Sequence, residues 1–158
     1  MNDESEVCLT FETAVQAAID MENRIYNNSL EALRIVKDQA AREILHEAAT
    51  AKLAHKHKLE QASVDGSLGE MVSNGPVSVM HLSVRCCDQH RIGADADARK
   101  ALAYAIQMAQ DALKFYRDMA HRCSGAPMAK IFTLLGDEQT RHLQQLEDTF
   151  EEDFLPEG

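Results

Sequence analysis

Two histidines occupy equivalent positions of an internal repeat. An offset of 87 residues aligns the two halves of the chain without gaps over the most informative stretches, and it brings His55 onto His142. The same offset aligns AIDM at 18–21 with AIQM at 105–108. Alanine and leucine often coincide when two helical sequences are overlaid, whereas a matched histidine is uncommon. Because imidazole binds metals and exchanges protons near neutral pH, this pair is a candidate for chemistry.

Each histidine follows a polar residue by three positions. Lys52 precedes His55, and Gln139 precedes His142. Residues three apart share one face of a helix.

A second spacing is also repeated. Glu22 lies 30 residues before Lys52, and Ala109 lies 30 residues before Gln139. The equal separation supports the register of the repeat.

Long helices must position these side chains. The chain is rich in Ala, Leu, Glu and Gln, and it has 5% aromatic residues, no Trp and three Pro, so it lacks the residues that short-strand β folds use. Thr10 and Asp38 predict helix N-caps, and Pro127 suits a first helical turn. The predicted helices span 11–36, 39–62, 95–121 and 127–153. We expect one all-α domain over residues 1–158, in which two antiparallel helical hairpins form a four-helix bundle.

Residues 63–94 are predicted to form a long crossover between the hairpins. Turn residues interrupt this stretch at Asp65-Gly66 and Asn74-Gly75-Pro76. Because about thirty residues without secondary structure would be unusual, we expect a short helix around 77–87.

Composition excludes several classes of partner. The net charge of -10 and the lack of a dense Lys/Arg stripe argue against nucleic acid and against an anionic membrane surface. No apolar run is long enough to span a bilayer, and residues 1–6 do not resemble a secretory signal. The cysteines form no C-x-x-C pair, so we expect reduced thiols in a cytoplasmic protein. They are Cys8, Cys86, Cys87 and Cys123.

The chain resembles the rubrerythrin-type branch of the ferritin-like superfamily. The resemblance rests on AIDMENRIY at 18–26, AIQMAQDALKFYR at 105–117 and the two histidine-bearing helices, and it covers roughly 11–150. It implies a ferritin-like up-down bundle whose centre takes one Glu from each of two helices and an E-x-x-H motif from each of the other two. It also implies a homodimer, for which we expect contacts at Val77, Val79 and Leu82.

Carried onto this chain, the resemblance gives a degenerate di-iron site. The retained ligand positions are Glu22, His55 and His142. The positions where a carboxylate is missing are Lys52, Ala109 and Gln139. Tyr116 falls where the family has a tyrosine near iron. Since the rubredoxin domain of full-length rubrerythrins is also missing, any redox turnover would need an external electron donor.

Two arrangements of this centre remain open. In the first, no metal binds, and the ammonium of Lys52 takes the metal's place, pairs with Glu22 and hydrogen-bonds Gln139. In the second, Lys52 moves aside or is deprotonated, and one zinc or ferrous ion binds. The ligands of that single ion would be Glu22, His55, His142 and Gln139.

An alternative function is that of a di-iron oxidoreductase acting on peroxide or oxygen. The two missing bridging carboxylates argue against it. A different register is offered by the E-x-x-H match of Glu43 and His46, although this match breaks the 30-residue spacing.

Overall fold

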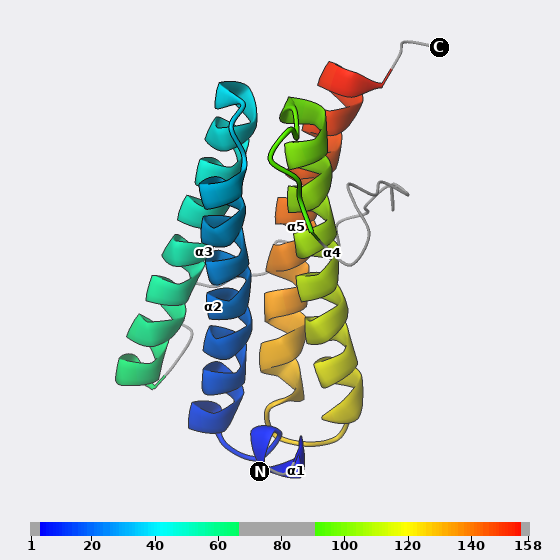
Figure 1. The fold of residues 1–158 in the computed structure, drawn as a ribbon. Coiled ribbons are helices and arrows are strands. Elements are labelled where there is room, and N and C mark those ends of the chain that lie inside the picture. Colours follow the sequence, from blue (N-terminus) through cyan, green and yellow to red (C-terminus); the bar gives the residue numbers. More distant parts are fainter. Residues whose placement is uncertain (1–3, 67–90, 156–158) are drawn as a thin grey trace.

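Four long helices and one short helix make up the computed structural model, which describes residues 4–66 and 91–155. No strand occurs within those two ranges. Figure 1 shows α2 and α5 running in one direction and α3 and α4 in the opposite direction, with α4 beginning at the end of the bundle where α2 ends. The helices are α1 (Glu4–Val7), α2 (Phe11–Ile35), α3 (Gln39–Asp65), α4 (Ala98–Arg122) and α5 (Ala129–Phe154). The predicted all-α four-helix bundle is confirmed at this level.

The start of each helix in the first hairpin follows from its capping residue. Thr10 accepts a hydrogen bond from the backbone N–H of Thr13 at 3.2 Å, and Asp38 accepts one from that of Ala41 at 2.9 Å. These contacts satisfy N–H groups that have no partner inside the helix, and they confirm both predicted caps. The first of these helices ends one residue before the predicted position, and the second extends to Asp65, where Gly66 adopts a left-handed conformation.

Helix starts in the second hairpin were predicted less well. The helix expected from residue 95 begins at Ala98, because Asp97 provides the cap for the N–H of Lys100. The prediction that Pro127 opens the last helix is wrong. A turn in which Ala126 donates to the carbonyl of Cys123 delays α5 to Ala129. The short helix expected around 77–87 and the dimer contacts expected there lie outside the described residues.

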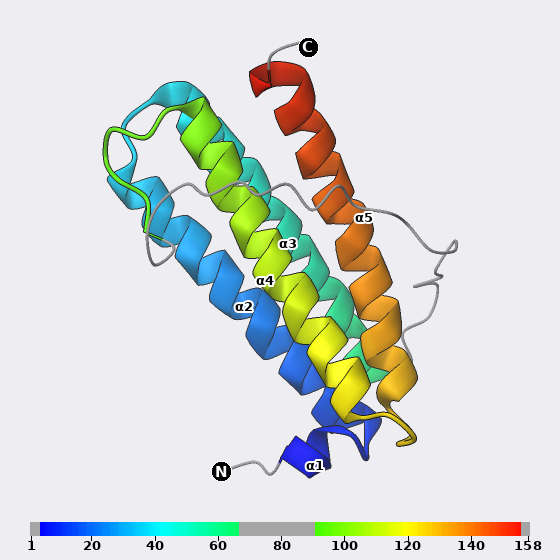
Figure 2. The same ribbon diagram turned by 90° about the vertical axis from the view of Figure 1, so that its right-hand side faces the viewer.

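Each hairpin packs closely on itself, and α4 also contacts α2 and α3 (Figure 2). Small residues face the interior on α4, and they let neighbouring helices approach. The fully or almost fully buried alanines of this helix include Ala101, Ala105, Ala109 and Ala112. On α5, Gly136 lies against Tyr116 of α4. These contacts fix the positions of the polar side chains at the centre of the bundle.

The expectation of reduced cysteines is wrong for one pair. Cys8 and Cys123 form a disulfide that joins the segment between α1 and α2 to the end of α4. Their separation of 115 residues explains why sequence spacing gave no sign of the bond. Because disulfides persist mainly in oxidising compartments, the cysteines no longer support a cytoplasmic location.

No helix in the described part of the chain is both long enough and apolar enough to cross a membrane.

Candidate functional site

A buried ion pair lies at the centre of the bundle. Nζ of Lys52 on α3 is 3.1 Å from Oε2 of Glu22 on α2, and both side chains are 3% exposed. The same ammonium donates a hydrogen bond to Oε1 of Gln139 on α5 at 2.9 Å. The predicted contacts of Lys52 with Glu22 and Gln139 are therefore confirmed.

Two further bonds anchor this network to α4. The hydroxyl of Tyr116 donates to Oε1 of Glu22 at 2.8 Å, and Nε2 of Gln139 donates to the carbonyl of Ala109 at 3.3 Å. Glu22 uses one carboxylate oxygen for Tyr116 and presents the other to Lys52. Within the described residues that second oxygen has no hydrogen bond of good geometry. The ammonium of Lys52 at 3.1 Å and Nδ1 of His55 at 3.8 Å both lie near this oxygen.

The internal repeat is visible in these contacts. Lys52 and Gln139, which are 87 residues apart, touch across the centre. His55 and His142 are related by the same offset, and their ring centroids are 6.0 Å apart in an edge-on arrangement. Equivalent residues of the two hairpins therefore face each other, as expected if the hairpins are related by an approximate two-fold axis.

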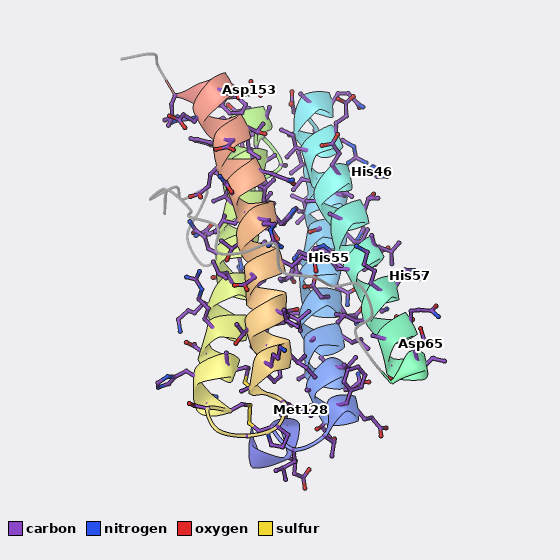
Figure 3. The ribbon with its side chains drawn as sticks, turned by 180° about the vertical axis from the view of Figure 1, so that it is seen from behind. His46, His55, His57, Asp65, Met128 and Asp153 are labelled. Carbon is purple, nitrogen blue, oxygen red and sulfur yellow. A yellow bond between two sulfur atoms is a disulfide. The ribbon has the colours of Figure 1, made fainter. Side chains whose placement is uncertain are left out.

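His55 lies between two carboxylates. Its Nδ1 is 3.8 Å from Oε2 of Glu22, and its Nε2 is 3.6 Å from Oε1 of Glu138. Figure 3 shows His55 between α3 and α5, whereas His46 and His57 lie on the outer side of α3. The alternative register through Glu43 and His46 thus falls on exposed residues, away from the centre.

Glu138 was not predicted from the sequence as a residue of the site. The offset of 87 residues relates it to Ala51, so the repeat comparison carries no sign of an acidic residue there. The available signal was its position one helical turn before His142 on α5. Glu138 is also 4.0 Å from Nζ of Lys58, which is 64% exposed, so this carboxylate links the centre to the surface.

The surroundings change the acidity of three groups. Burial by itself raises the pKa of Glu22, but the nearby imidazole of His55, the ammonium of Lys52 and the hydroxyl of Tyr116 lower it to about 2. Burial, together with the charges of Lys52 and His55, lowers the pKa of His142 to about 4. Burial and the negative charge of Glu22 raise the pKa of Tyr116 well above its usual value. At neutral pH Glu22 is therefore ionised, and His142 and Tyr116 are neutral.

The pocket beside this network is small. Its lining includes Glu22, His55, Tyr116, Glu138 and Gln139. The space open to the centre of a water molecule is about 10 Å³, which is roughly what a single water needs. An organic substrate does not fit there in this conformation.

The donor set does not fit a di-iron centre. At the four positions where such a centre needs a carboxylate, this chain has Glu22, Lys52, Ala109 and Gln139, and the ammonium of Lys52 lies directly against Glu22. In the described ranges no three His, Cys, Asp or Glu side chains are arranged as a metal-binding group. Four residues were predicted to hold a single ion. Three of them line one pocket, namely Glu22, His55 and Gln139. The ring of the fourth, His142, contacts the ring of His55.

Comparison with known proteins found no protein-family model, no curated protein and no solved structure that matches this chain.

Proposed function

We propose that this chain is a divergent ferritin-like bundle of the rubrerythrin type, in which a buried ion pair replaces the di-iron centre. The observation that carries the proposal is the position of Nζ of Lys52, between the carboxylate of Glu22 and the amide of Gln139. The protein then acts as a metal-independent helical bundle, through its surface. Its activity does not follow from that of the di-iron family.

The arrangement of the helices supports the ferritin-like part of this proposal. The two hairpins run up-down and down-up, so α4 starts at the end of the bundle opposite to the end of α3 (Figure 1). One long crossover between two hairpins is the connectivity of ferritin-like bundles. Contacts between residues 87 apart also support an origin in two similar hairpins.

Charge supports the metal-free part. A di-iron centre gathers several carboxylates, whose mutual repulsion is offset by the metal ions. Here one carboxylate, Glu22, faces one ammonium, Lys52, and the pair is neutral. A divalent cation bound at Glu22 would lie beside the positive charge of Lys52, which repels it.

Elemental analysis of the full chain, purified without chelators and loaded aerobically with Fe²⁺ or Zn²⁺, tests this function. We expect much less than one metal ion per chain after gel filtration. Two irons per chain with an oxo-bridged ferric absorption band would instead establish the di-iron oxidoreductase, which in that case needs an external electron donor.

A second candidate is a mononuclear zinc or ferrous site. The contact between the rings of His55 and His142 favours it, because His142 is neutral at pH 7 and its lone pair is free of a proton. Glu22 and Gln139 would complete the ligand set once Lys52 moved aside. This candidate predicts about one ion per chain, and changing both histidines to alanine should abolish binding. Metal content that is unaffected by the double change would rule it out.

The oligomeric state and location are separate proposals. The family resemblance favours a homodimer, which analytical ultracentrifugation would reveal. The disulfide opposes the cytoplasmic location expected from the sequence.

A further inference from the structure

The Cys8–Cys123 disulfide lies at the end of the bundle where α2 begins and α4 ends (Figure 1). Cys8 lies between α1 and α2, and Cys123 immediately follows α4, with Cα atoms 5.2 Å apart. In Figure 1, α1 lies beside the turn between α4 and α5. The backbone N–H of Met128, in that turn, donates to the carbonyl of Cys8 at 3.2 Å. One covalent and one non-covalent link therefore join the N-terminal segment to this turn.

Both sulfur-bearing residues are covered by protein. Cys8 is 6% exposed and Cys123 is not exposed at all. They belong to the main apolar core, and Val7 and Phe11 pack against its edge. Little of either residue is therefore open to a reductant in solution while the N-terminal segment is docked.

A specific hydrogen bond holds that segment. Oγ1 of Thr13, in the first turn of α2, donates to the carbonyl of Glu6 in α1 at 2.8 Å. This bond joins α1 to α2 independently of the disulfide. Weakening it should make α1 undock more often without changing the sulfur atoms.

We propose that the Cys8–Cys123 disulfide is reversibly reduced and oxidised, and that the docking of α1 controls how fast it is reduced. When α1 undocks, a thiolate of a dithiol reductant attacks one sulfur, forms a mixed disulfide and releases the other cysteine as a thiolate. The second thiol of the reductant then displaces the first cysteine. The protein gains two electrons and two protons, and the reductant becomes a cyclic disulfide. In reverse, oxidised glutathione accepts the two electrons and two protons from the cysteines and leaves as two thiols.

The proposal is independent of the ion pair at the bundle centre, and native-state reduction kinetics test it. The full chain is incubated with dithiothreitol, and differential alkylation followed by peptide mapping reports Cys8 and Cys123. Thr13→Val should accelerate reduction roughly 2- to 10-fold, the effect expected from losing one hydrogen bond. Thr133→Val is the matched control, because Thr133 donates only to the carbonyl of Ala129 within α5, on an exposed face.

Circular dichroism first verifies that each variant is folded. Equal reduction rates for wild type and Thr13→Val would overturn control by α1, and so would an equal acceleration by Thr133→Val. The reduced wild type is also exposed to oxidised glutathione. Recovery of the disulfide-linked Cys8–Cys123 peptide supports a reversible disulfide. Failure of this peptide to form would overturn the proposal.

Discussion

Replacing Lys52 with methionine removes the positive charge of the central ion pair while keeping a long, flexible side chain that fits a helix. Nζ of Lys52 lies 3.1 Å from the carboxylate of Glu22, and both side chains are 3% exposed, so this change leaves Glu22 buried without its counter-charge. Measured losses on removing one partner of a buried ion pair are about 3–5 kcal/mol. We therefore expect Lys52→Met to lower the free energy of unfolding by about 3 kcal/mol at pH 7.

The loss should depend on leaving Glu22 buried without its partner. The double variant Glu22→Gln with Lys52→Met removes both charges, so it should regain most of the stability, since replacing a whole buried pair is often nearly neutral. Lys58→Met is the matched surface control. Lys58 is 64% exposed and 4.0 Å from Glu138, so the cost should stay within about 0.5 kcal/mol.

Urea unfolding at pH 7, followed by circular dichroism, measures all three variants. The difference should appear in the midpoint at an unchanged slope, because the surface exposed on unfolding is the same. If Lys52→Met is as stable as wild type, or if the double variant is no more stable than the single one, the ion pair is not a structural element of the core.

The other predictions concern the groups around the pair. Tyr116→Phe removes the hydroxyl that donates to Glu22 at 2.8 Å, and it should cost about 1.5–3 kcal/mol in urea unfolding; a loss below 0.5 kcal/mol would show that the bond contributes little. Gly136→Ala should stabilise the protein by about 0.5–1 kcal/mol, because the added Cβ meets Tyr116 Cβ at an ordinary 3.7 Å. The control Gly125→Ala should destabilise it, since Gly125 has a φ of 82°, and a gain at both positions would refute the reasoning. Acid should lower the free energy of unfolding in two stages, because the folded pKa values of His142 and Glu22 both lie below their ordinary values of 6.5 and 4.5. The contribution of His142 is complete above pH 6.5 and is lost as pH falls toward about 4, whereas that of Glu22 is complete above pH 4.5 and is lost as pH falls through about 2. His142→Gln should remove only the upper stage in pH-dependent urea unfolding, and an unchanged profile would contradict this assignment.

Much of the centre could be predicted from the sequence because regular helices convert spacing into position. Once Glu22, Lys52 and Gln139 were placed on long helices in a common register, their meeting followed from the repeat. The two N-caps at Thr10 and Asp38 were predictable for a similar reason, since capping depends on residues only three positions apart.

Other features depend on how the helices pack. Glu138 faces His55 across α3 and α5, but its repeat partner is an alanine, so symmetry carried no signal. The disulfide joins residues 115 positions apart, and no local pattern selects Cys123 over the remaining cysteines as the partner of Cys8. The delayed start of α5 reflects a turn closed by backbone hydrogen bonds, which competed with the preference of Pro127 for a first helical turn.

The central claim is that Lys52 takes the place of a metal ion, and calorimetric titration with Zn²⁺ and Fe²⁺ under anaerobic conditions tests it most directly. The account predicts negligible binding by the wild type and by the surface control Lys130→Glu, at an exposed position in the first turn of α5. It predicts stronger binding by Lys52→Glu, and stronger still when Ala109→Glu and Gln139→Glu are added, because each change restores a carboxylate to the bundle centre. Stoichiometric binding by the wild type, or no gain in affinity from Lys52→Glu, would contradict it.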